Sequence, residues 1–268
     1  MSQRTAQIAY VANDGTRPFY YANAHEKDRV PVELHPMAVH DARALDAHVD
    51  REGFQLVRHS SAITDWTDRA ALADIHRAEV AQLIKDLTGA DEVQVNAPGI
   101  LRFSEKSGKA GSTDNSHPAR FAHIDINDQT AAQFAERGAD GRKFTRCAAY
   151  NLWRALSPAP QDVPLAFCDA RSFAPADLIV ADAIFDPPNG APEWSFESWV
   201  VAHAPQHRWY FYPDMAADEA VLFKTNDSDP ARAHCVPHLA FDDPLAPADA
   251  PPRVSIEMRA TAYWWAKD

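Results

Sequence analysis

Apolar and polar positions follow two different patterns along this chain, and the change comes near residue 92. In the first third, three segments alternate apolar and polar residues and predict strands: Gln7–Ala12, Val30–Leu34 and Phe54–Arg58. Between them, Asp41–Arg51 places apolar residues at spacings of three and four, which predicts a helix. A longer helical pattern begins at Asp65 and runs to a glycine at position 89. The first third is therefore expected to mix strands with helices.

From residue 92 onward, segments of strand type follow one another and are separated by Pro, Asp and Asn turns. We expect strands within 92–97, 99–105, 120–126, 145–153, 164–170, 177–185, 197–204, 207–213, 220–226 and 254–265. One helix is expected at Gln129–Arg137. Because helical patterns do not alternate with the strands, parallel βαβ winding is disfavoured, and a sandwich or barrel is favoured.

The predicted fold class is mainly β, with a double-stranded β-helix (jelly roll) as its core. We expect this core at 92–268 and a flank of N-terminal helices and strands at 1–91. Proline-rich stretches punctuate the chain as turns, and none of them has the character of an interdomain linker. A single domain, 1–268, is therefore expected.

Composition and charge narrow the classes of partner. Of the 268 residues, 26 are Lys or Arg and 38 are Asp or Glu, a net charge of −12, so neither nucleic acid nor an anionic membrane is expected as a partner. No apolar run approaches the roughly 18 residues of a membrane helix, and the first residues lack the apolar block of a signal peptide. Cys147, Cys168 and Cys235 show no CxxC spacing and are interpreted as reduced thiols. We expect a cytoplasmic protein that acts on a small molecule, and the oligomeric state stays open.

His123 and Asp125 stand two residues apart in a segment of strand type. In a strand, residues i and i+2 face the same side, so one imidazole and one carboxylate point together and offer two ligands for a divalent transition metal. One more histidine would complete a facial triad that leaves coordination positions open. A second His-x-Asp at 48–50 lies in a helical pattern, where the two side chains diverge, and is set aside.

The later part of the chain supplies a third ligand and a group that binds carboxylates. His234 and His238 are both available as the third ligand, and the residues alone leave that choice open. Further on, Arg253 and Ser255 again share a strand face, where a guanidinium fork and a hydroxyl suit a carboxylate. Arg259 lies on the same face and is an alternative to Arg253.

Three residues of the segment 150–154 are candidates for contact with a substrate. Tyr150 is expected in the pocket wall or the core, because aromatic residues on strands usually pack. Asn151 and Arg154 could reach the pocket, and Arg154 could pair with a carboxylate of substrate or cosubstrate or form a structural ion pair. No general acid or base beyond the metal ligands is expected.

In chain order, HxD, a distant histidine and RxS resemble the signature of Fe(II)/2-oxoglutarate-dependent dioxygenases. A closer resemblance runs from about Gln94 to the C-terminus. The segments RFAHIDI, YNLWRAL, PLAFCDARSF, FKTNDSD, PHLAFDDP and PRVSIEMRA are similar to those of the AsaB-like hydroxylase/desaturase family, also described as cephamycin-methoxylase-related (CmcJ-type).

This resemblance implies a nonheme iron oxidoreductase of secondary metabolism that uses Fe(II), 2-oxoglutarate and O2. It implies His123, Asp125 and His238 as iron ligands, with His238 preferred to His234 because it lies in PHLAFDDP. It further implies that Arg253 and Ser255 hold 2-oxoglutarate. The expected reaction is hydroxylation, desaturation or ring closure of a small molecule.

Other functions remain compatible with the residues. A cupin-like metal-dependent hydrolase or isomerase could use the same three ligands with Zn(II) or Mn(II). An oxidase that does not use 2-oxoglutarate, or a jelly roll that binds a small acid without turnover, would also fit. The pattern leaves the substrate open between a small carboxylic acid, an amino acid and a polycyclic natural product.

Overall fold

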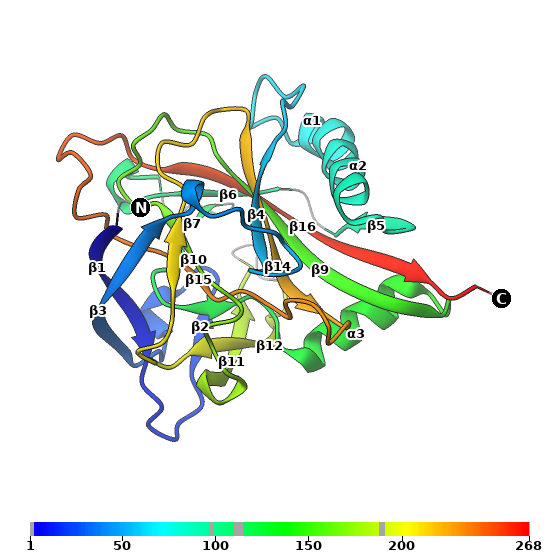
Figure 1. Ribbon diagram of the computed structural model, residues 1–268, viewed down its shortest axis with the longest axis horizontal. Coiled ribbons are helices and arrows are strands. Elements are labelled where there is room, and N and C mark those ends of the chain that lie inside the picture. Colours follow the sequence, from blue (N-terminus) through cyan, green and yellow to red (C-terminus); the bar gives the residue numbers. More distant parts are fainter. Residues whose placement is uncertain (1–2, 97–98, 110–114, 188–190, 268) are drawn as a thin grey trace.

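Two β-sheets form most of the molecule (Figure 1). The computed structural model describes residues 3–96, 99–109, 115–187 and 191–267. Within these residues, the first sheet has the strand order β1-β3-β13-β10-β15-β8-β12-β11-β2. Its strands are β1 Gln3–Val11, β2 Phe19–Tyr21, β3 Val32–Asp41, β8 His123–Ile124, β10 Leu165–Cys168, β11 Leu178–Phe185, β12 Trp194–Val201, β13 Trp209–Phe211 and β15 His238–Ala240.

The second sheet has the order β4-β14-β9-β16-β6-β7, with β5 also paired to β16. Its strands are β4 Phe54–Arg58, β5 Glu92–Val95, β6 Ile100–Phe103, β7 Asn115–Ser116, β9 Phe144–Ala155, β14 Glu219–Asp227 and β16 Val254–Trp265. The expectation of a mainly β protein is therefore confirmed, and β4 and β9 reproduce two expected strands closely.

Three α-helical segments complete the described structure. α1 Arg69–Ala71 and α2 Arg77–Thr88 are joined by a π-helical stretch, Leu72–His76, into one continuous helix on the outer face of the second sheet. The side chain of Asp68 caps its start, and Gly89 ends it at φ +67°, so the expected helix is confirmed with a start three residues late. α3 Asp128–Ala139 follows β8 and matches the helix expected there.

The prediction of a helix at Asp41–Arg51 is wrong. β3 continues as far as Asp41, and only a 3-10 turn at Ala42–Ala44 follows. The end of β3 pairs with β1 on one side and runs parallel to β13 on the other, so its backbone groups are satisfied by neighbouring strands. The His-x-Asp at 48–50 lies in a turn, where Asp50 forms ion pairs with Arg146 and Lys224.

The two faces of the second sheet pack against different parts of the molecule. Met258, Ala260 and Ala262 of β16 pack with α2 on the outer face. The alternate residues, from Arg253 just before β16 through Thr261, project toward the first sheet, because side chains alternate along a strand. Apolar side chains of both sheets, including Trp153 of β9, fill the space between them. The inner face of β16 is thus one wall of the molecule's interior.

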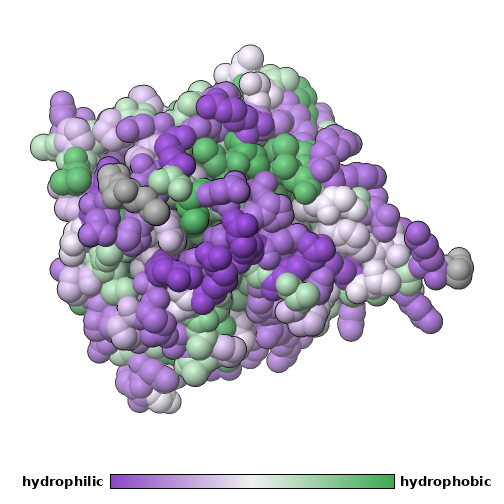
Figure 2. Space-filling view, in the orientation of Figure 1, coloured by the Kyte–Doolittle hydropathy of each residue, from purple (hydrophilic) through white to green (hydrophobic). Residues whose placement is uncertain are grey.

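Residues before position 92 contribute to both sheets, since β1 and β3 belong to the first and β4 to the second. Among the described residues, no helix is long and apolar enough to span a bilayer. The face of the molecule shown in Figure 2 is largely hydrophilic, with apolar residues in smaller groups between polar ones.

Candidate metal centre and its surroundings

The pairing of β8 with β15 brings together residues that are far apart in the sequence. His123 and His238 are direct partners in this antiparallel pair, and Asp125 follows two residues after His123. All three side chains are buried, and each offers one ligand atom within 4.8 Å of the others. Among the described residues this is the one group of three or more such side chains that could hold a metal ion.

Backbone carbonyl groups set the orientation of both imidazoles. Nδ1 of His123 donates to the carbonyl of Phe121 at 3.0 Å, and Nδ1 of His238 donates to the carbonyl of Val236 at 3.1 Å. This leaves the Nε2 lone pairs facing the carboxylate of Asp125, at 3.9 Å and 3.8 Å respectively. Two imidazoles and one carboxylate in this arrangement form a facial donor set.

The protonation states also suit a metal. Burial, with the neighbouring imidazole of His238, lowers the pKa of His123 to about 3, so its ring is neutral near neutral pH. Burial alone would raise the pKa of Asp125, but the charge of Arg259 and the two histidines hold it below its usual range. Neutral imidazole and ionised carboxylate are the forms that bind a divalent cation.

Two further side chains hold the carboxylate of Asp125. Nδ2 of Asn151 donates to Oδ2 at 2.6 Å, and the guanidinium of Arg259 donates to Oδ1 at 2.8 Å. Nε of Arg259 also donates to Glu257 at 2.8 Å. Arg259 is thus shared between two carboxylates of the protein, and both oxygens of Asp125 are fixed in place.

Arg253, directly before β16, and Ser255 of β16 form a second buried polar site. Arg253 is 1% exposed and Ser255 is fully buried. One guanidinium nitrogen of Arg253 donates to the carbonyl of Val163 at 2.7 Å, while its Nε and the hydroxyl of Ser255 have no partner. Buried polar groups are normally satisfied, so two adjacent donors without acceptors indicate a site for an anionic ligand.

Further cations surround this second site. Burial and the nearby charges of Arg102 and Arg120 lower the pKa of Arg253, which means that its charged form is disfavoured there. Nη1 of Arg120 and Nδ1 of His117 are also buried without a partner. A dianion such as a dicarboxylate would supply the missing acceptors and offset the repulsion. Arg102 and Arg120 stand at no motif spacing, so no pattern in the sequence indicated their place beside this site.

Comparison with known proteins identifies the family. The family described as an oxidoreductase/YMDC permease-like domain matches residues 8–263. Hydroxylase/desaturase efuI of Hormonema carpetanum is 30% identical over 88% of this chain and 86% of its own length. Alpha-ketoglutarate-dependent dioxygenase phiK of Fungal sp. (strain ATCC 74256) is 30% identical over 92% of this chain and 91% of its own length. The chain belongs to the hydroxylase/desaturase family of Fe(II)/2-oxoglutarate-dependent oxygenases.

The fold of this family member agrees with the comparison. The solved structure of iron and alpha-ketoglutarate-dependent endoperoxidase NvfI superposes with a TM-score of 0.81, and the match covers 99% of each chain at 22% sequence identity. The resemblance stated from the sequence motifs is therefore confirmed at the level of the family. Enzymes of this kind use Fe(II), 2-oxoglutarate and O2, and the donor set of His123, Asp125 and His238 suits that metal.

Other sequence-predicted residues lie away from the triad of this oxygenase. His234 is half exposed and its Nε2 contacts Asp128 at 2.7 Å, outside the triad. Arg154 lies on the opposite face of β9 from Asn151, where it donates to the carbonyls of His59 and Ala217 at 2.9 Å each. The interpretation of Arg154 as a contact to substrate or cosubstrate is therefore not supported, because alternation along β9 turns it outward.

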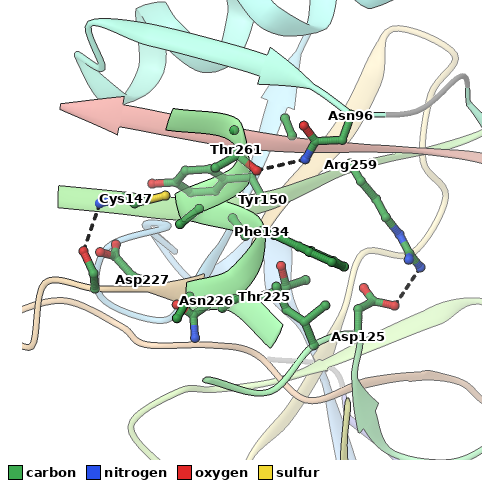
Figure 3. Close-up of a pocket in the computed structure, with 18 of the residues that line it drawn as sticks. Asn96, Asp125, Phe134, Cys147, Tyr150, Thr225, Asn226, Asp227, Arg259 and Thr261 are labelled. Carbon is green, nitrogen blue, oxygen red and sulfur yellow. Dashed lines mark hydrogen bonds and ion pairs between the residues drawn. The ribbon is translucent and has the colours of Figure 1, made fainter. Parts of the chain in front are cut away.

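A large cavity opens beside Asp125 (Figure 3). Its volume is about 870 Å³, and its lining includes Tyr150 and Asn151, two of the three residues considered for substrate contact. Asp125 and Arg259 lie together at one end of the view, while Cys147 and Asp227 lie at the other.

Burial raises the pKa of Cys147 to about 12, so its thiol stays protonated, and all three cysteines are free and buried.

Proposed function

We propose that this oxygenase binds Fe(II) through Nε2 of His123, Nε2 of His238 and the carboxylate of Asp125. The observation that carries the proposal is the convergence of three buried ligand atoms within 4.8 Å of one another. The carbonyl groups that accept from both Nδ1 atoms support it further, since they select the tautomer that leaves Nε2 free.

We propose further that Arg253 and Ser255 hold the distal carboxylate of 2-oxoglutarate. Their unpaired donors belong to residues two positions apart at the start of β16 and suit a carboxylate. Arg259 is less suited to that role, because its guanidinium already binds Asp125 and Glu257. Arg102 and Arg120 add positive charge near the same site.

Iron, 2-oxoglutarate and O2 together supply the oxidising power that removes a hydrogen atom from a C–H bond of the substrate. The protein contributes position and environment. Asn151 and Arg259 fix the iron-binding carboxylate of Asp125, and the buried face of β16 holds the cosubstrate away from bulk water. The product would be an alcohol, an alkene or a new ring in a small molecule.

We propose a double-stranded β-helix for the two packed sheets and one domain for the whole chain. Strands from before position 92 pair with strands from after it at the edges of both sheets, which supports a single folding unit. A cytoplasmic location fits the three free, buried cysteines.

The decisive experiment is anaerobic reconstitution with Fe(II), followed by 2-oxoglutarate and then air. We expect one iron per chain, a visible charge-transfer band when 2-oxoglutarate chelates the iron, and slow release of succinate without added substrate. A protein that binds iron but neither forms the band nor releases succinate would favour the hydrolase or isomerase class instead.

A further inference from the structure

The cavity beside Asp125 is large enough for a whole organic molecule. Its volume of about 870 Å³ lies toward the upper end of the roughly 300–1,000 Å³ typical of small-molecule sites. α3, β9, β14, β16 and the paired strands β11 and β12 contribute to its walls. Since Asp125 and Asn151 line it, a molecule in this cavity would have one end next to the proposed iron ligands.

Aromatic side chains form much of the wall that faces α3. Phe134 projects from α3 into the cavity (Figure 3), and its ring meets Phe196 of β12 edge to face at 5.5 Å. Phe185 and Trp194 stack at 4.2 Å beside them, and Trp194 is 51% exposed. Exposed aromatic surface that borders a cavity is free to bury itself against an apolar ligand.

Small side chains give the cavity its width. Ala131, Ala132 and Ala135 of α3 face it from one side, and Ala149 of β9 faces it from the sheet. A flat or globular hydrocarbon frame can therefore enter between the helix and the sheet.

The charges of the lining residues disfavour an anionic ligand. Arg259 is shared between Asp125 and Glu257, and Arg137 lies over the ring of Phe134, 5.8 Å from its centre. The acidic lining residues are Asp125, Asp128, Glu136 and Asp227. Asp227 is neutralised by ion pairs with Arg146 and Lys224, which leaves Asp128 and Glu136 as the lining carboxylates without an arginine or lysine partner among the described residues. A carboxylate placed here would lie near the carboxylates of Asp128 and Glu136 and would lose its hydration without gaining an unshared cationic partner.

Several other polar groups of the cavity are uncharged amides and hydroxyls. Nδ2 of Asn96 donates to Oγ1 of Thr261 at 2.9 Å on one wall, and Thr225 and Asn226 lie on another. Amide and hydroxyl groups of this kind can bind the hydroxyl or carbonyl groups of a ligand.

We infer that the substrate is a bulky, uncharged and predominantly apolar molecule with few oxygen functions, bound between α3 and β9 with one end beside Asp125. Of the three substrate classes open from the sequence, this selects the polycyclic molecule over a small carboxylic acid or an amino acid. The inference rests on the proposed function for the meaning of "substrate", but the binding property itself belongs to the cavity.

Two dyes with one ring system test this inference on purified protein without iron. N-phenyl-1-naphthylamine is neutral, and 8-anilinonaphthalene-1-sulfonate carries the same rings with an added sulfonate. We expect the neutral dye to bind at one site per chain with increased fluorescence, and the sulfonate to bind more weakly by roughly tenfold or more, about 1.4 kcal/mol. Equal or tighter binding of the sulfonate would overturn the inference.

Variants locate the dye. Ala149→Phe fills the cavity from β9, and Ala132→Trp narrows it from α3, where position 132 is exposed. Both should weaken binding of the neutral dye by roughly tenfold or more, while Gln133→Phe, on α3 but outside the lining, should leave it unchanged. Unchanged dye binding in Ala132→Trp would place the dye elsewhere and refute the proposal.

Separate titrations keep the two proposals apart. In Ala132→Trp, Fe(II) stoichiometry and the 2-oxoglutarate charge-transfer band should equal those of the unmodified protein. If dye binding behaves as expected but the band is absent in both proteins, the cavity inference holds and the proposed function fails. If the band forms and the sulfonate binds best, the proposed function holds and the cavity inference fails.

Discussion

His123 and His238 occupy directly opposed positions on β8 and β15, and their ring centres lie 4.3 Å apart. The register of this short strand pair therefore brings together two histidines that are far apart in the sequence. Ring nitrogens on the two strands are turned toward Asp125 by the carbonyl groups of the residues two positions before each histidine. The donor set is thus preorganised by backbone hydrogen bonds.

Replacement of His238 should abolish tight iron binding, whereas replacement of His234 should not. His238→Ala removes one of three donors, but His234 contacts Asp128 at the rim of the cavity. Iron content after anaerobic loading and desalting measures the difference, and His234→Ala is the matched control. Full iron content in His238→Ala would show that the ligand assignment is wrong.

Replacing Arg253 should affect the binding of 2-oxoglutarate, whereas replacing Arg259 should affect the binding of iron. Arg253→Met removes a charge-assisted hydrogen bond to the cosubstrate, worth about 1.5–3 kcal/mol, so the Kd for 2-oxoglutarate should rise roughly 10- to 150-fold. Iron content should not change. Arg259→Met should instead weaken iron binding, since Asp125 loses a partner. Titration of the charge-transfer band and an iron-chelator competition measure the two effects, and the opposite pattern would reassign the cosubstrate arginine.

Asn151 should act through Asp125 as a positioning residue. Asn151→Ala leaves Oδ2 of Asp125 without its donor at 2.6 Å, and loss of such an outer partner typically lowers metal affinity roughly 10- to 100-fold. Competition with a chelator gives the Fe(II) affinity directly. Asn96→Ala changes another amide of the cavity lining and should leave it unchanged. Equal affinities for Asn151→Ala and the unmodified protein would contradict this role.

The stability of the fold should fall as the pH drops below about 6.5, the ordinary histidine value. Burial lowers the pKa of His76 and of His207 in the folded protein, so only the unfolded chain gains these protons in that range. Each such group contributes a slope of up to about 1.4 kcal/mol per pH unit. Urea unfolding at several pH values between about 5 and about 7, the range in which a free histidine titrates, gives the free energy of unfolding at each pH.

His76→Gln should flatten this pH dependence, because the unfolded state then has one group fewer to protonate. His48→Gln is the control, since that ring is exposed in the folded protein. A slope that is the same in His76→Gln as in the unmodified protein would show that His76 does not contribute.

Local patterns in the sequence were sufficient to predict several elements of this structure. Period-two alternation predicts β4, and the strand-type composition between turn residues predicts β9 and β16, because a strand buried on both faces is apolar along most of its length. The spacing of His123 and Asp125 is a property of one short segment, and the order of motifs that follows it was enough to indicate the family. The long helix ending at Gly89 is likewise encoded in its own cap residues.

Other features depend on which strands become neighbours. Asp41–Arg51 has the spacing of a helix, but pairing with β1 and β13 keeps its first residue in β3. Arg154 and Asn151 differ only in their face of β9, and the packing of α2 against one face of this strand, rather than composition, decides which face is inside.

By itself, the sequence determined the mainly β class, the His-x-Asp pair and the family. Only the tertiary structure decided that His238 rather than His234 meets that pair, that Arg259 is bound to Asp125 while Arg253 keeps unpaired donors, and that the adjoining cavity is apolar. The physical reason is that periodicity reports the face of a residue within its own element. Convergence of side chains depends on the register between strands that lie far apart in the chain.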